Sequence, residues 1–99
     1  MTKKRTPIHP GEILLKEFLE PLEISQNKLA REIGVPVSRI AGIVKGDRAI
    51  TADTALRLGV FFATSAQMWL NLQNAYDLRM AERSVWPAIK AKVRPHKAA

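Results

Sequence analysis

Short and cationic side chains in the middle of the chain have the chemistry needed to contact nucleic acid. Arg39 could pair with a guanine edge or a backbone phosphate, and Ser38 could donate or accept a hydrogen bond at either. Val37 could contact a thymine methyl group. Lys45 and Arg48 suit phosphate groups as cationic clamps. These residue types favour a surface that binds DNA over a surface turn with no target.

Neighbouring positions would assist that surface. Gln26 begins a predicted helix, where its side chain and the free N–H groups of the first turn can hold a phosphate. Gly42 lies one turn beyond Ser38 on the same face, where it permits close approach but cannot read a base. Asn27 and Lys28 are weaker candidates. The full set of predicted DNA-binding residues is Gln26, Asn27, Lys28, Val37, Ser38, Arg39, Gly42, Lys45 and Arg48.

The pattern around these residues predicts two short helices joined by a tight turn. Apolar residues recur at helical spacing on one face of each helix: Leu29, Ala30, Ile33, Ile40, Ile43 and Val44. Gly34 lies where the backbone must adopt positive φ, and Pro36 presets φ for the next first turn. This arrangement predicts a helix-turn-helix whose second helix can enter a major groove.

Five helices and no strand are predicted. They cover approximately residues 10–22, 26–33, 36–45, 52–62 and 66–80. His9 is expected to cap the first helix, and Ser25, Thr51 and Ser65 are good N-caps for later ones. A flexible tail is expected from Lys90 onward.

Three regions follow from these predictions. Residues 1–7 form a flexible basic arm, residues 8–83 form one helix-turn-helix domain, and residues 84–99 form an extension and basic tail. The state of residues 84–89 within that extension is left open.

An aromatic-rich stripe marks the last predicted helix. Trp69, Leu72, Tyr76 and Met80 recur at spacings of three and four. Core packing is the favoured interpretation for Trp69. The stripe as a whole predicts a dimer interface, because residues 66–86 hold more apolar surface than a five-helix monomer easily buries.

Charge is distributed unevenly along the 99 residues, whose formal net charge is +7. The two ends hold seven cations: Lys3, Lys4, Arg5, Lys90, Lys92, Arg94 and Lys97. The nine basic and nine acidic residues between them leave the body neutral, with an acidic first helix and a basic middle. One basic face and two basic ends suit a polyanion, although the ends would also suit solvated tails.

Composition argues against several other classes of protein. The chain has no cysteine and only two histidines, so no disulfide, metal site or other cofactor is expected. It shows no catalytic triad, glycine-rich phosphate loop or paired-carboxylate pocket, so neither enzymatic activity nor a small-molecule ligand is expected. No apolar run approaches the ~18 residues of a membrane span, so a cytoplasmic location is expected.

Three further segments give the chain a specific resemblance. They are His9–Glu12 with the leucine-rich helix after it, residues 46–58 (GDRAITADTALRL) and residues 68–78 (MWLNLQNAYDL). With the helix-turn-helix, the chain resembles the Cro/cI-type (XRE) family over about residues 8–80, and within it the HigA-type, VapI-like antitoxins. The resemblance implies a compact lambda-repressor-like domain that dimerises on operator DNA, represses its own operon and neutralises a HigB/RelE-like mRNA interferase.

One departure and two alternatives accompany this resemblance. Many relatives carry longer polar side chains where this chain has Ala41 and Gly42, which leaves the operator bases undetermined. A solitary XRE-type regulator without a toxin fits the sequence nearly as well. A module that binds protein, with basic tails on RNA, is the third interpretation.

Overall fold

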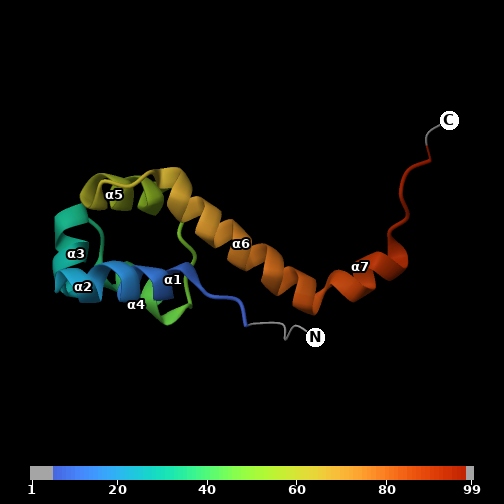
Figure 1. Ribbon diagram of the computed structural model, residues 1–99, viewed down its shortest axis with the longest axis horizontal. Helices are drawn as coiled ribbons and strands as arrows, with labels where there is room; N and C mark the ends of the chain where they lie inside the picture. Colours follow the sequence, from blue (N-terminus) through green and yellow to red (C-terminus); the bar gives the residue numbers. More distant parts are fainter. Residues whose placement is uncertain (1–5, 98–99) are drawn as a thin grey trace.

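The computed structural model describes residues 6–97, and every regular element among them is helical (Figure 1). The predicted all-α fold with a helix-turn-helix is confirmed. Six helical rods follow one another within the described residues, one more than expected, because a short helix is added near the C-terminus. Residues 1–5 of the predicted arm and 98–99 of the predicted tail lie outside the described residues.

The first rod combines α1 (Pro10–Ile13), a π-helical segment η1 (Leu14–Leu19) and α2 (Glu20–Leu22). His9 caps it as predicted, because its Nδ1 accepts a 2.9 Å hydrogen bond from an amide of the first turn. The two ends of η1 are five residues apart and both buried, a spacing that the wider π-helical turn accommodates. The rod ends where Glu23 adopts φ 55°.

The predicted helix-turn-helix consists of α3 (Gln26–Ile33) and α4 (Val37–Lys45). Ser25 caps α3 through a 3.0 Å bond from the amide of Lys28 to its hydroxyl oxygen. Both helices end at a glycine in the left-handed region, Gly34 at φ 74° and Gly46 at φ 87°. The turn chemistry expected from the sequence therefore sets the boundaries of both helices.

Two longer helices complete the domain. Thr51 caps α5 (Ala52–Phe62), and Ser65 caps α6 (Ala66–Ser84), as predicted. The chain turns between them at Ala63, which adopts φ 56°. The first half of α6 packs against α5 and α1, and its second half projects away from the body (Figure 1).

The C-terminal segment differs from the expectation. Residues 86–92 form α7 (Trp86–Lys92), so the tail expected from Lys90 begins only after Lys92. Pro87 cannot donate an amide to the preceding turn, which interrupts α6, but it fits the first turn of a new helix. Two lysines in the last turn of α7 stabilise its C-terminal end by interaction with the helix dipole. The helix was not predicted from the sequence, because seven residues are too few to show a clear helical periodicity.

The buried core joins all the helices of the body. It comprises Leu14, Leu19, Leu29, Ala30, Ile33, Ile40, Ile43, Ile50, Ala55, Leu58 and Trp69. Trp69 is 0% exposed and its indole N–H donates a 2.8 Å hydrogen bond to Thr64, which confirms core packing. Gly11 lets α1 rest on α4, because a Cβ atom there would overlap the carbonyl oxygen of Ile43.

Candidate nucleic-acid interface

The exposed face of α4 is the centre of the candidate interface. Ile40 and Ile43 are fully buried and hold the opposite face of the helix against the core. Helical spacing then turns Ser38, Gly42 and Lys45 outward along one line. Ser38 and Lys45 are exposed and Gly42 is half-buried. The outward face of α4 thus carries small and cationic side chains, and a DNA groove can accommodate such a face.

The start of α3 supplies donors beside that helix. The hydroxyl of Ser25 accepts the amide of Lys28, and the carbonyl oxygen of Ser25 accepts the amide of Leu29. The amides of Gln26 and Asn27 open the helix and have no partner of their own within it. Asn27 and Lys28 are exposed and Gln26 is half-buried, so this turn can face an anion such as a phosphate.

Arg39 is turned to the side of the outward line and is held by an acidic residue. Its Nη1 donates a 2.9 Å hydrogen bond to Oδ2 of Asp53, which lies in the first turn of α5. Arg57 donates to the same oxygen from its Nε at 3.1 Å. The hydrogen bond from Arg57, followed by its charge and the contact with Arg39, lowers the pKa of Asp53 below 3.8. The charged Asp53 therefore orients Arg39 while leaving most of its five donors available.

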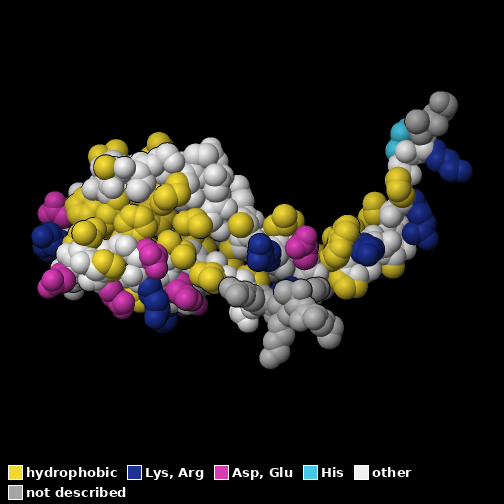
Figure 2. Space-filling view, in the orientation of Figure 1, with side chains coloured by type: hydrophobic (Ala, Val, Ile, Leu, Met, Phe, Trp, Pro, Cys, Tyr) yellow, Lys and Arg dark blue, Asp and Glu magenta, His cyan; other side chains and the backbone are white. Residues whose placement is uncertain are grey.

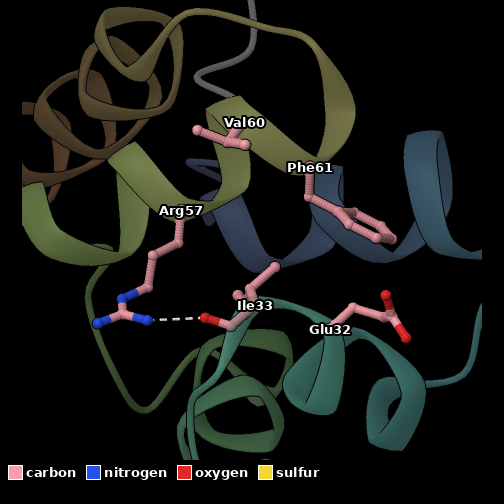
Figure 3. Close-up of a pocket in the computed structure, with 5 residues that line it drawn as sticks. All are labelled: Glu32, Ile33, Arg57, Val60 and Phe61. Atoms are coloured by element: carbon pink, nitrogen blue, oxygen red, sulfur yellow. Dashed lines mark hydrogen bonds between the residues drawn. The ribbon is translucent and has the colours of Figure 1, made fainter.

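Arg57 also ties α5 to the end of α3. Its Nη1 donates a 2.8 Å hydrogen bond to the carbonyl oxygen of Ile33, at the turn of the helix-turn-helix (Figure 3). The two residues line an open groove of about 280 Å³ together with Glu32, Val60 and Phe61. Asp53 and Arg57 are thus positioning residues that were not identified as such from the sequence.

The remaining predicted basic residues are Lys45 at the end of α4 and Arg48 in the loop after it. Lys45 and Asp47 form a long ion pair of 3.9 Å with both side chains more than two-thirds exposed, so Lys45 remains available to a phosphate. Arg48 is exposed in the loop that follows, and Val37 is 45% exposed at the start of the helix. The structure thus brings the outward line of α4 and Arg48 together, with Arg39 turned to one side of that line.

A buried glutamine fixes the loop that carries Arg48. Gln73 in α6 is 5% exposed, and its Oε1 accepts the amide of Ile50 at 2.8 Å. Its Nε2 donates to Oδ1 of Asp77 at 2.9 Å. Gln73 was missed from the sequence, although a polar residue one turn after the buried Trp69 is a signal that could have found it.

His9 joins three elements near the same loop. Its ring packs edge-on against Tyr76 of α6, with centroids 4.8 Å apart, and it lies beside Gly46 at the end of α4. Burial lowers the pKa of His9 below 6.5, and the charges of Asp77 and Asp47 oppose that shift. The neutral form fits the structure, because Nδ1 must accept the capping hydrogen bond.

The four residues of the predicted dimer stripe differ in how far they are buried within one copy of the chain. Trp69 is enclosed within the domain, while Leu72 and Tyr76 are half-buried and Met80 is 42% exposed. Other exposed apolar side chains lie around and beyond Met80, on the projecting end of the chain: Leu78, Val85, Trp86, Ile89 and Val93. Figure 2 shows hydrophobic side chains interspersed with lysine and arginine along the projecting end of the chain.

Two other kinds of site are not found in the part of the chain that the structure describes. Between residues 6 and 97, no helix is long and apolar enough to cross a membrane. The same residues contain no group of three histidine, cysteine, aspartate or glutamate side chains that could hold a metal ion.

Known proteins resemble this chain in both sequence and structure. A family profile described as helix-turn-helix matches residues 15–69, more than half of the chain. Virulence-associated protein I of Dichelobacter nodosus is 57% identical over 76 residues, which are 77% of this chain and 70% of that protein. An addiction module antidote protein of the HigA family from Coxiella burnetii aligns with a TM-score of 0.88 and 47% identity, over 93% of this chain and 100% of that one. The Pseudomonas aeruginosa antitoxin HigA, solved with the higBA promoter, aligns with a TM-score of 0.89 and 45% identity, over 92% and 99%.

Proposed function

Because this chain belongs to the helix-turn-helix family, with HigA antitoxins among its relatives, we propose that it is a DNA-binding antitoxin that represses its own operon. The observation that carries the proposal is the outward line of α4, with Ser38 and Lys45 exposed on a helix whose other face is fully buried. Such a braced helix can enter the major groove without disturbing the core. Operator binding would place the protein in the cytoplasm.

The DNA contacts divide into two kinds in this proposal. The first turn of α3, with Gln26, Asn27 and Lys28, holds a phosphate and fixes the register on the duplex. Val37, Ser38 and Arg39 approach base edges from the start of α4. Lys45 holds a phosphate at the other end of that helix. The availability of these side chains supports the assignment.

A symmetric dimer is the second part of the proposal. Met80 and the exposed apolar residues of the extension support it, because a lone copy leaves them in water. Two copies would present two α4 helices to half-sites about one helical turn, ~34 Å, apart. Light scattering during gel filtration measures the mass directly. A single 11.1 kDa species at high concentration would remove the dimer.

A HigB/RelE-like toxin is the proposed protein partner. The names of the HigA relatives support this, since an antitoxin acts on a toxin. The test is to express the chain with the product of its neighbouring gene and measure copurification and rescue of growth. A neighbourhood without any small toxin gene would leave the solitary regulator as the better description.

Operator binding is tested by fluorescence anisotropy on a duplex that carries the chain's own promoter, with a scrambled duplex as the reference, at ~150 mM salt. We expect a preference of ~10³-fold or more. Arg39→Ala should abolish this preference, whereas Arg83→Ala, which removes the same charge from exposed α6, should preserve it. Equal affinity of the unchanged protein for both duplexes would contradict the proposed function.

A further inference from the structure

The loop after α4 folds back onto the helix at Gly42. The carbonyl oxygen of Gly42 accepts hydrogen bonds from the amides of Asp47 at 2.9 Å and Arg48 at 3.1 Å, after Gly46 reverses the chain. Ile50, two residues further on, is anchored by Gln73. The backbone on both sides of Arg48 is therefore fixed relative to α4.

This fold-back lays the side chain of Arg48 over the outward face of α4. A Cβ atom on Gly42 would lie 3.3 Å from Cβ of Arg48, 3.7 Å from its Nε and 3.9 Å from its Cδ. The stem of Arg48 therefore occupies the space that a side chain at position 42 would otherwise fill. Glycine at this position therefore seats the arginine, in place of the open room for DNA expected from the sequence.

The electrostatic surroundings leave the guanidinium of Arg48 available. Within residues 6–97, no carboxylate lies at salt-bridge distance from Arg48, whereas Arg39 is paired with Asp53. Ser38 and Lys45 flank Gly42 on the outward line, and neither carries a planar group with two parallel donors. The Cδ and Nε atoms of Arg48 lie against Gly42, in the middle of this face.

We propose that Arg48, seated on Gly42, reads a guanine in the major groove and so determines operator sequence. Two parallel N–H groups match the O6 and N7 acceptors of guanine, a geometry that a lysine cannot reproduce. The packed stem reduces the freedom that the side chain loses on binding. The inference rests on the proposed DNA-binding function and replaces the phosphate role predicted for Arg48 from the sequence.

The experiment measures affinity for the promoter duplex and for scrambled DNA over a range of salt concentrations, with Arg48→Lys and Arg48→Ala. Base reading predicts that both variants lose about 10- to 100-fold on the promoter and less than about 3-fold on scrambled DNA. Lys45→Ala is the matched phosphate control. It should weaken binding to both duplexes equally and reduce the magnitude of the salt slope by roughly 0.9 for each phosphate that the variant no longer neutralises.

A second arm identifies the base. Guanines of the promoter duplex are replaced one at a time by 7-deazaguanine, which lacks the N7 acceptor. The unchanged protein should lose about 10-fold at one guanine of each half-site, and Arg48→Ala should be insensitive there. Gly42→Met, which replaces glycine by a good helix former, should displace the arginine and match Arg48→Ala. Combining the two changes should cost no more than either alone.

The outcomes separate the two proposals. If the unchanged protein prefers its promoter but Arg48→Lys keeps that preference, Arg48 is a phosphate clamp and this inference is overturned. If the unchanged protein shows no preference, the proposed function itself fails. Circular dichroism spectra confirm in each case that the variant is folded.

Discussion

Replacing Gln73 by leucine tests whether the loop that carries Arg48 is held from α6. Leucine has nearly the same volume but accepts no hydrogen bond, so the amide of Ile50 would lose its 2.8 Å partner. Ile50 is 2% exposed, and water has little access to the amide that would be orphaned. An unsatisfied buried donor costs about 1–3 kcal/mol of unfolding free energy. For a domain of this size, that loss lowers the Tm by roughly 5–20 °C.

The assay is thermal and urea unfolding of Gln73→Leu beside Gln67→Leu. Gln67 lies on the same helix but is exposed and donates its side-chain amide to Asn71, so its replacement should change stability by less than about 0.5 kcal/mol. Hydrogen exchange supplies a local readout, since the Ile50 amide should lose protection before the core does. Equal stability of the two variants, with the Ile50 amide still protected, would refute the reasoning.

Three further changes test other parts of the structure. Gly11→Ala should destabilise the domain by at least about 1–3 kcal/mol in urea unfolding, because α1 must move for its Cβ to clear the carbonyl of Ile43; an unchanged urea midpoint would contradict that packing. The free energy of unfolding should fall as pH drops below 6.5, because the lowered pKa of His9 in the folded protein lets the unfolded chain bind the proton first. His9→Gln should flatten this pH dependence. An unaltered slope of unfolding free energy against pH would exclude His9 as its source. Trp69→Ala should cost ~3–5 kcal/mol by thermal melting, whereas Trp86→Ala, at a 46% exposed position, should cost far less; equal losses would argue against a single core around Trp69.

Local chemistry made the helix boundaries predictable. Ser25, Gly34 and Gly46 act within one turn of their own positions, through side-chain caps or positive φ. Such effects depend on neighbours in the sequence, so the residues that frame α3 and α4 could be identified from the chain alone. The burial of Trp69 followed from a helical stripe in the same way.

Interactions between distant residues were not predictable by these rules. The pair of Arg39 and Asp53 joins positions 14 apart, and the hydrogen bond from the Ile50 amide to Gln73 joins positions 23 apart. Single-sequence patterns carry no register between helices, so they could propose Arg39 as a DNA contact without revealing which residue orients its side chain. Likewise, a glycine at position 42 suggested a bare groove surface until the fold placed Arg48 over it.

The straight course of α6 has a geometric consequence for any dimer built on its projecting end. Its 19 residues form one uninterrupted rod, and nearly all residues beyond Tyr76 are exposed. In the proposed dimer, the length of α6 fixes the distance between the dimer contact and the surface proposed to bind DNA. Each residue inserted in its exposed half would advance the far end by about 1.5 Å and rotate it by about 100°. The length and phase of this helix would therefore set the spacing between operator half-sites, independently of the side chains that recognise each one.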